Sequence, residues 1–132
     1  MSEAPAQIRG LTLDTGALLA LEHGSGRIRR LFHWAEQLKV PLWIPAGVLV
    51  QAWRGSSRQA VVAKLLADRR TTVAPLDELT ARAIGQLCGQ SGHHNVVDVS
   101  VVLCARQRGH AVVTSDPKDI AAVDPSLRLI EP

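Results

Sequence analysis

The chain has 132 residues, of which 46% are apolar and 20% are charged, so it can bury the core of one globular domain. This composition excludes the low hydrophobicity and high net charge of a disordered chain. The sequence contains no apolar run of about 18 residues, the length that predicts a membrane helix. Its first residues lack the basic and apolar regions of a signal peptide. We therefore expect a single domain over residues 1–132 of a cytoplasmic protein, with Cys88 and Cys104 as buried thiols.

The formal net charge of +3 is unevenly distributed along the chain. Residues 27–70 contain nine basic and two acidic residues, whereas residues 1–26 and 71–132 each carry a net charge of −2. A basic middle segment favours a polyanionic partner such as a nucleic acid. A solvated helix face is the structural alternative.

Short apolar runs alternate with segments of helical period, which is typical of a parallel sheet covered by helices on both faces. In chain order, strands are predicted over residues 11–14, 42–44, 72–74, 111–114 and 127–130. Helices are predicted over residues 15–23, 27–38, 46–54, 58–68, 78–88, 96–107 and 117–123. The predicted fold class is α/β, a three-layer α/β/α architecture with a mainly parallel central sheet.

Four carboxylates fall at the beginnings of predicted helices. Asp14 and Asp116 end strands, Asp98 lies in the first turn of a helix capped by Asn95, and Asp119 follows Asp116 by three residues. Helix capping explains each of them taken alone. However, parallel strands that both end in Asp bring their carboxylates to one edge of the sheet, and clustered carboxylates require a cation. Oxygen ligands of this kind favour Mg²⁺ or Mn²⁺ over zinc.

Four segments carry a resemblance to a known family: LTLDTGALLAL, IPAGVLVQAWRG, VVDVSVVLCARQRG and VVTSDPKDI. In order and spacing they resemble the PIN-domain ribonucleases, especially the VapC-like toxins of bacterial toxin–antitoxin pairs, over about residues 8–130. The resemblance implies an RNA substrate, a homodimer, and a cognate antitoxin that inserts a segment into the acidic groove. It makes Asp14, Asp98 and Asp116 the catalytic, metal-binding acids and Asp119 an accessory metal-binding acid, supported through hydrogen bonds by Thr114 or Ser115.

One position departs from the family pattern. A Glu normally precedes the small-Trp-Arg-Gly segment, and this chain has Gln51 there. Because an amide oxygen carries no charge, the expected affinity for a divalent cation is lower.

Two functions therefore stay open on the sequence. The first is a metal-dependent endoribonuclease toxin that cleaves RNA phosphodiester bonds, in which Arg54 and Arg58 bind flanking phosphates. The second is a PIN-like domain that binds RNA or antitoxin without efficient cleavage.

Other motifs add less. A phosphoacceptor receiver or a haloacid-dehalogenase-like domain also uses an Asp after its first strand, but the second acid of the dehalogenase pattern is replaced by Gly16, and the acidic pair of a receiver is absent. Trp34, Trp43 and Trp53 are predicted to be buried in the core or at a subunit interface, with base stacking as the alternative. The His93–His94 pair is predicted to lie in a loop.

Overall fold

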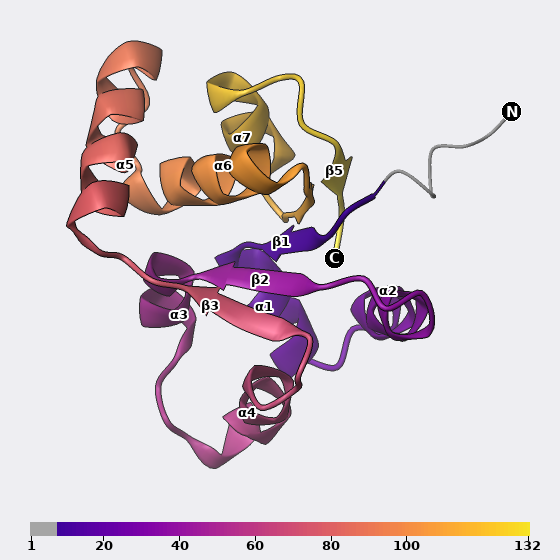
Figure 1. Ribbon diagram of the computed structural model, residues 1–132. Coiled ribbons are helices and arrows are strands. Elements are labelled where there is room, and N and C mark those ends of the chain that lie inside the picture. Colours follow the sequence, from indigo (N-terminus) through magenta and orange to yellow (C-terminus); the bar gives the residue numbers. More distant parts are fainter. Residues whose placement is uncertain (1–7) are drawn as a thin grey trace, which may run out of the picture.

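Five parallel strands form the central sheet, in the order β3-β2-β1-β4-β5. The computed structural model describes residues 8–132 (Figure 1). Because every neighbouring pair is parallel, the carboxyl ends of all five strands lie at the same edge of the sheet. The strands are β1 (Leu11–Leu13), β2 (Leu42–Pro45), β3 (Thr71–Ala74), β4 (Ala111–Val113) and β5 (Leu129–Ile130).

Seven α-helices and one 3₁₀ turn connect these strands within residues 8–132. They are α1 (Thr15–Glu22), α2 (Gly26–Gln37), α3 (Ala46–Ala52), the 3₁₀ turn η2 (Ser57–Gln59), α4 (Ala60–Leu66), α5 (Glu78–Ser91), α6 (Val96–Arg108) and α7 (Pro117–Val123). Figure 1 shows α5, α6 and α7 on one face of the sheet and α1, α3 and α4 on the other. The predicted three-layer α/β/α architecture is confirmed.

Several helix boundaries differ from the sequence prediction, most of them by one or two residues. The helix predicted over residues 58–68 divides into η2 and α4. The helix predicted to end at Cys88 continues to Ser91. Its last three residues are glycine or polar, so they do not extend the apolar period, although their backbone is still helical. The helix stops at Gly92, whose φ of +73° is a left-handed conformation that glycine adopts without strain.

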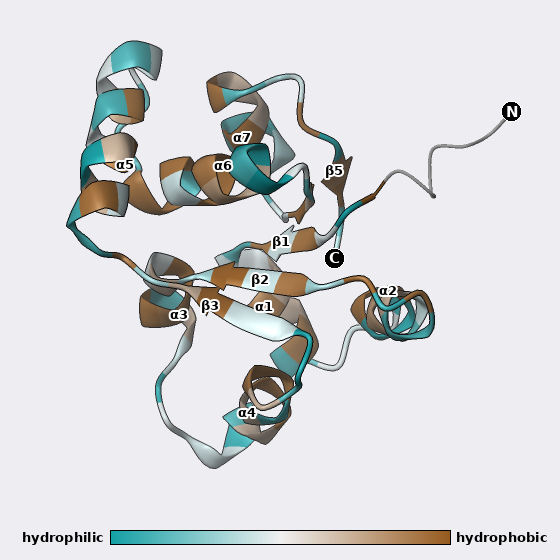
Figure 2. Cartoon of the chain, viewed as in Figure 1, coloured by the Kyte–Doolittle hydropathy of each residue, from teal (hydrophilic) through white to brown (hydrophobic). Residues whose placement is uncertain are grey.

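The core lies on both faces of β1, β2 and β4, and Figure 2 shows the strands and the inner helix faces as the most hydrophobic parts of the chain. Helix α6 is buried on more than one side, because it packs on the sheet and also contacts α5 and α7. Full burial of one Val or Leu side chain contributes about 1.5–3 kcal/mol. The first turn of α6, which carries Asp98, is thereby fixed next to the carboxyl edge of the sheet.

A buried polar cluster joins β1 to α6 and β4. Nδ1 of His110 lies 2.9 Å from the Thr12 hydroxyl, which donates to Cys104 Sγ at 3.5 Å. The Trp43 indole packs against the His110 ring, with centroids 6.3 Å apart, and the Arg108 guanidinium lies 4.0 Å above the indole. Burial, aided by the nearby Arg108 charge, lowers the pKa of His110 to about 4. The imidazole is therefore held neutral inside the fold.

Several burial predictions need correction. Cys104 is buried as predicted, but Cys88 is only half-buried, and both thiols are free. Trp34 and Trp43 are half-buried, whereas Trp53 is 39% exposed, so its placement in the core is wrong and its placement at a subunit interface stays a prediction. The reason for this exposure is that α3 ends at Ala52, one residue before Trp53, so the helical turn that would direct the indole inward does not include it. No helix in the described part of the chain is long and apolar enough to cross a membrane.

Candidate carboxylate site

Asp14 follows β1 and is buried at the start of α1. Its carboxylate accepts the Ala17 N–H at 2.9 Å and so caps the helix. Burial raises the pKa of Asp14, and the negative charge of Asp116 adds to this effect. Hydrogen bonds from Thr114, Ala17 and Ser115 oppose the increase but do not cancel it. The site therefore contains a buried carboxylate whose negative charge is incompletely compensated.

Asp116 follows β4 and stands at the start of α7. Unlike Asp14, it makes no side-chain capping hydrogen bond within the described residues, and Pro117 begins the helix after it. Its backbone N–H donates to the Thr114 hydroxyl at 2.8 Å, and that hydroxyl is also hydrogen-bonded to the Asp14 carboxylate. Thr114 is fully buried and connects the two strand ends. The capping explanation thus accounts for Asp14 but not for Asp116.

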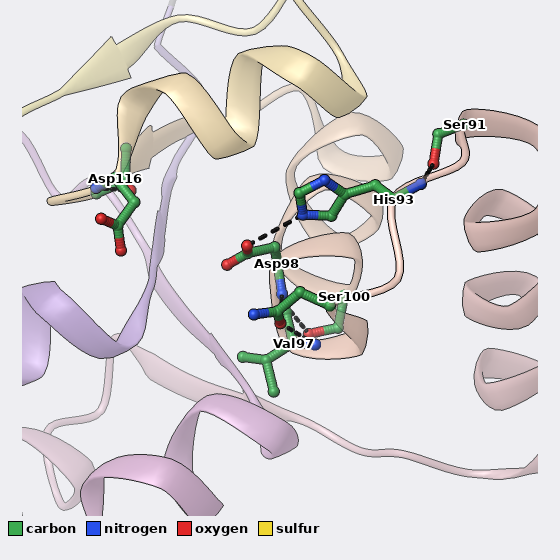
Figure 3. A network of polar contacts seen from close by, with 8 residues as sticks. Ser91, His93, Val97, Asp98, Ser100 and Asp116 are labelled. Atoms are coloured by element: carbon green, nitrogen blue, oxygen red, sulfur yellow. Dashed lines mark hydrogen bonds and ion pairs between the residues drawn. The ribbon is translucent and has the colours of Figure 1, made fainter.

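Asp98 is oriented by a histidine from the preceding loop. Its Oδ2 lies 3.2 Å from His93 Nε2, and both side chains are largely buried. Asn95 is the cap of α6, as predicted, since its side chain accepts the N–H groups of Val97 and Asp98 at 3.1 Å each. The Asp98 carboxylate is therefore not needed as a cap. Figure 3 shows it turned toward the side on which Asp116 lies.

The His93 contact was not predicted from the sequence. The pair was assigned to a loop, which is correct, but a separation of five residues is not a spacing at which helical side chains meet. The left-handed turn at Gly92 and the hydrogen bond from the His93 N–H to Ser91 Oγ, 3.2 Å long, direct the imidazole back over α6. The sequence feature that could have indicated this contact is a glycine followed by histidine shortly before the cap of a helix.

Gln51 lies beside this group of acids. Its Oε1 accepts the hydroxyl of Thr15, the residue after Asp14, at 2.7 Å. The contact places Gln51 of α3 against the start of α1. The supporting role of Gln51 at the acids stays a prediction.

The acids are not assembled into a closed cage. Within residues 8–132, no three His, Cys, Asp or Glu side chains are grouped closely enough to hold a metal ion. Asp14 and Asp116 interact electrostatically, Asp98 is paired with His93, and Asp119 is exposed in the first turn of α7. The donors are nevertheless all oxygens, and a cation next to Asp14 would relieve its uncompensated charge. In donor chemistry the residues fit a hard divalent cation.

Comparisons with known proteins bear on this arrangement. No protein-family model matches the sequence, and no curated protein matches it significantly. Solved structures do match. A chain of VapBC2 from Rickettsia felis bound to a DNA fragment from their promoter has a TM-score of 0.64 and 18% identity, covering 92% of this chain and 97% of that one.

Two further structures agree with the first. FitAB bound to an IR36 DNA fragment has a TM-score of 0.57 and 16% identity, covering 92% of this chain and 94% of that one. FitAcB from Neisseria gonorrhoeae has a TM-score of 0.55 and 17% identity, covering 91% and 96%. The chain has a PIN-like fold. The predicted resemblance to VapC-like PIN domains is confirmed at this level.

The basic side chains of the PIN-like fold that were predicted to bind RNA lie after α3. Arg54 and Arg58 are both exposed. The Arg54 guanidinium donates to the carbonyls of Val50 at 3.1 Å and Trp53 at 2.8 Å, so its charge lies at the carboxyl end of α3. This position complements the negative end of the helix dipole and is also open to solvent.

A cavity of about 480 Å³ lies elsewhere in the PIN-like fold, between α5 and α6 and near the ends of β2 and β3. Its walls are mainly apolar, and they include Leu76 and Val96, both of which are exposed. None of the four predicted acids lines it. We therefore do not place the metal chemistry in this cavity.

Proposed function

We propose that the chain is a metal-dependent endoribonuclease of the toxin–antitoxin type, acting as one domain over residues 1–132. The observation that carries this proposal is the link from Asp14 through the Thr114 hydroxyl to Asp116 at the ends of the central strands β1 and β4. A purely structural role does not explain why a carboxylate is buried beside a second one. A PIN-like fold with acids at this edge fits hydrolysis of a phosphodiester.

In the proposed mechanism Asp14, Asp98 and Asp116 hold Mg²⁺ or Mn²⁺, with Asp119 as an accessory ligand. A bound divalent cation would supply neutralisation of the phosphodiester charge and activation of the attacking water. Thr114 fixes the Asp14 carboxylate through its hydroxyl, and Ser115 adds a backbone hydrogen bond.

The remaining side chains have positioning roles in this proposal. His93 fixes the rotamer of Asp98 before a ligand arrives. Arg54 and Arg58 bind phosphates that flank the cleaved bond, because exposed guanidinium groups attract the backbone whatever its sequence.

The proposal includes partners of two kinds. A cognate antitoxin and a second copy of this chain are expected, together with a cytoplasmic location. The likeness to chains of the VapBC2 and FitAB complexes supports a partner of the antitoxin class. Exposed Leu76 and Val96 at the α5–α6 cavity support self-association, since such apolar surface is usually covered by another subunit.

A second candidate function is favoured by Gln51. Its amide is neutral and is already bonded to Thr15, so the site has one negative charge fewer than the family pattern implies. In that case the domain binds RNA or antitoxin and cleaves inefficiently. Product formation separates the two candidates.

The test measures cleavage of pooled RNA with Mg²⁺, with Mn²⁺ and after removal of metal by EDTA. Asp14→Asn, Asp98→Asn and Asp116→Asn should each abolish cleavage while the far-UV circular dichroism is retained. Asp77→Asn is the matched control, because it makes the same chemical change at a helix cap. There the Asp77 carboxylate accepts the Thr80 N–H at 2.8 Å. This variant should keep full activity.

Two results would contradict the proposal, one in its choice of residues and the other in its activity. Undiminished cleavage in all three site variants would refute the assignment of these acids. Wild-type protein that binds RNA but forms no product with either metal would establish the second candidate instead.

A further inference from the structure

The loop that follows α3 is held in place by one buried glutamine. Gln59 is only 3% exposed, and its Oε1 accepts the backbone N–H groups of Arg54 at 2.6 Å and Gly55 at 2.9 Å. Its Nε2 donates to the carbonyl of Ala52, at the end of the helix. Three backbone groups that α3 leaves unbonded are thereby satisfied. A buried polar side chain with this many bonds to one loop fixes the shape of residues 53–56.

The fixed loop displays an aromatic ring next to positive charge. Trp53 is 39% exposed although tryptophan is usually well buried. The Arg54 guanidinium is bonded to the Trp53 carbonyl, and Arg58 is exposed shortly after. Gly55 has a φ of +73°, a conformation that side chains other than glycine adopt only with strain. The loop is therefore a preorganised arrangement of an indole and guanidinium groups.

The loop follows α3, the helix that contacts the start of α1. Gln51, two residues before Trp53, contacts Thr15 beside Asp14. Between Glu36 and Asp68 the sequence contains four basic residues and no acidic one, so the net charge of this segment attracts a polyanion. Aromatic side chains beside cationic ones are the usual means of binding a single-stranded nucleic acid.

We propose that Trp53 is a stacking platform for one unpaired base of the RNA strand, and that Gln59 is the residue that positions it. The inference rests on the proposed function for its choice of RNA. It adds a base contact to the phosphate contacts proposed for Arg54 and Arg58, and this contact would fix the register of the bound strand on the loop. A stacked base needs the π face of Trp53, whereas the phosphates on either side need only charge.

A protein partner would use this surface differently. Val50 is 75% exposed and lies three residues before Trp53, at the end of the same helix. An apolar partner helix would cover both side chains, because residues three apart are neighbours on a helix surface. A base stacked on the indole leaves Val50 uncovered. The flanking arginines favour the base.

The test is equilibrium binding of a short, unstructured, 2′-O-methyl RNA, which resists cleavage, measured in EDTA by fluorescence anisotropy at several salt concentrations. Trp53→Ala should weaken binding about 5- to 150-fold, the equivalent of about 1–3 kcal/mol for one stacked base, without changing the salt slope. Trp53→Phe should retain most of the affinity. Arg58→Gln should reduce the slope by about 0.7, as expected when one phosphate contact is lost from a single strand.

An RNA with abasic positions completes the experiment. Wild-type protein should bind it less tightly than the intact RNA, and Trp53→Ala should bind the two equally, because the contact is already lost. The ratio of the Kd for abasic RNA to the Kd for intact RNA should be similar in Gln59→Leu and in Trp53→Ala. Gln59→Glu, which keeps the acceptor for Arg54 and Gly55, should restore part of that ratio.

The outcomes that overturn the proposal are distinct from failure of the nuclease. Equal losses for intact and abasic RNA in Trp53→Ala, or no loss for either, would refute stacking. A Val50→Ala variant that weakens RNA binding as much as Trp53→Ala would also refute it, and binding of an apolar peptide instead would assign the surface to a protein partner. Cleavage is measured separately, so a wild-type protein that shows the expected binding pattern but no cleavage would still support the stacking role of Trp53.

Discussion

Lowering the pH below about 6.5 should destabilise this protein because of His110. The raised pKa of Asp14 acts in the opposite sense, and it does so equally in wild type and in a variant at position 110. The His110 side chain is 7% exposed, and its pKa is lowered from 6.5 to about 4 by burial and by Arg108. Unfolding exposes the imidazole, which then takes up a proton below about pH 6.5. The unfolded state therefore binds the extra proton, so the free energy of unfolding falls as the pH falls from about 6.5 to about 4. At 1.36 kcal/mol per pKa unit, the loss is about 3 kcal/mol.

The assay is urea unfolding from about pH 7 to about pH 4, with wild type compared with His110→Asn. The asparagine keeps a polar atom where Nδ1 meets the Thr12 hydroxyl and does not titrate. Its cavity lowers stability equally at every pH, so the pH dependence isolates the imidazole. Asp68 and Asp124, whose pKa values are lowered by their hydrogen bonds, lose stability only below about pH 3.8 and do so in both proteins. Parallel stability curves for the two proteins would refute the reasoning.

The remaining predictions concern single side chains. Gly16→Ala should destabilise the fold by about 1–3 kcal/mol in thermal unfolding and reduce cleavage, because its Cβ would lie 2.7 Å from Ser115 Cβ; unchanged stability would contradict this contact. Gly89→Ala, in a helix interior with open space, should raise the free energy of unfolding in urea by about 0.5–1 kcal/mol. Gly92→Ala, at positive φ, should lower it by about 1 kcal/mol. A change of the same sign in both variants would refute the end assigned to α5. Gln51→Glu should tighten Mn²⁺ binding about tenfold in calorimetry, and an unaltered affinity would place Gln51 outside the site.

The layering of the fold could be predicted because its signals are local. Apolar runs such as residues 111–113 are too short for helices, and the amphipathic segments between them have the helical period. Asn95 was correctly predicted as a cap, because a polar side chain before a helix meets the N–H groups of its own first turn.

The site was less accessible from sequence, because its contacts join distant segments. Nothing local distinguishes Asp14, which caps a helix, from Asp116, which does not; the difference lies in the backbone conformation before each helix. The exposure of Trp53 depends on the residue at which α3 ends, and the role of Gln59 depends on a loop that folds back on it. The metal-binding roles of the acids stay predictions.

The position of β1 in the middle of the sheet also determines when the site can form. Its neighbour β2 follows soon after it in the chain, but its other neighbour, β4, comes after β3 and four further α-helices. Chains fold from the amino terminus as they are made, so a growing polypeptide can complete the β1–β2 side while Asp14 still lacks Asp116. The two carboxylates therefore come together only after β4 has been added to the sheet.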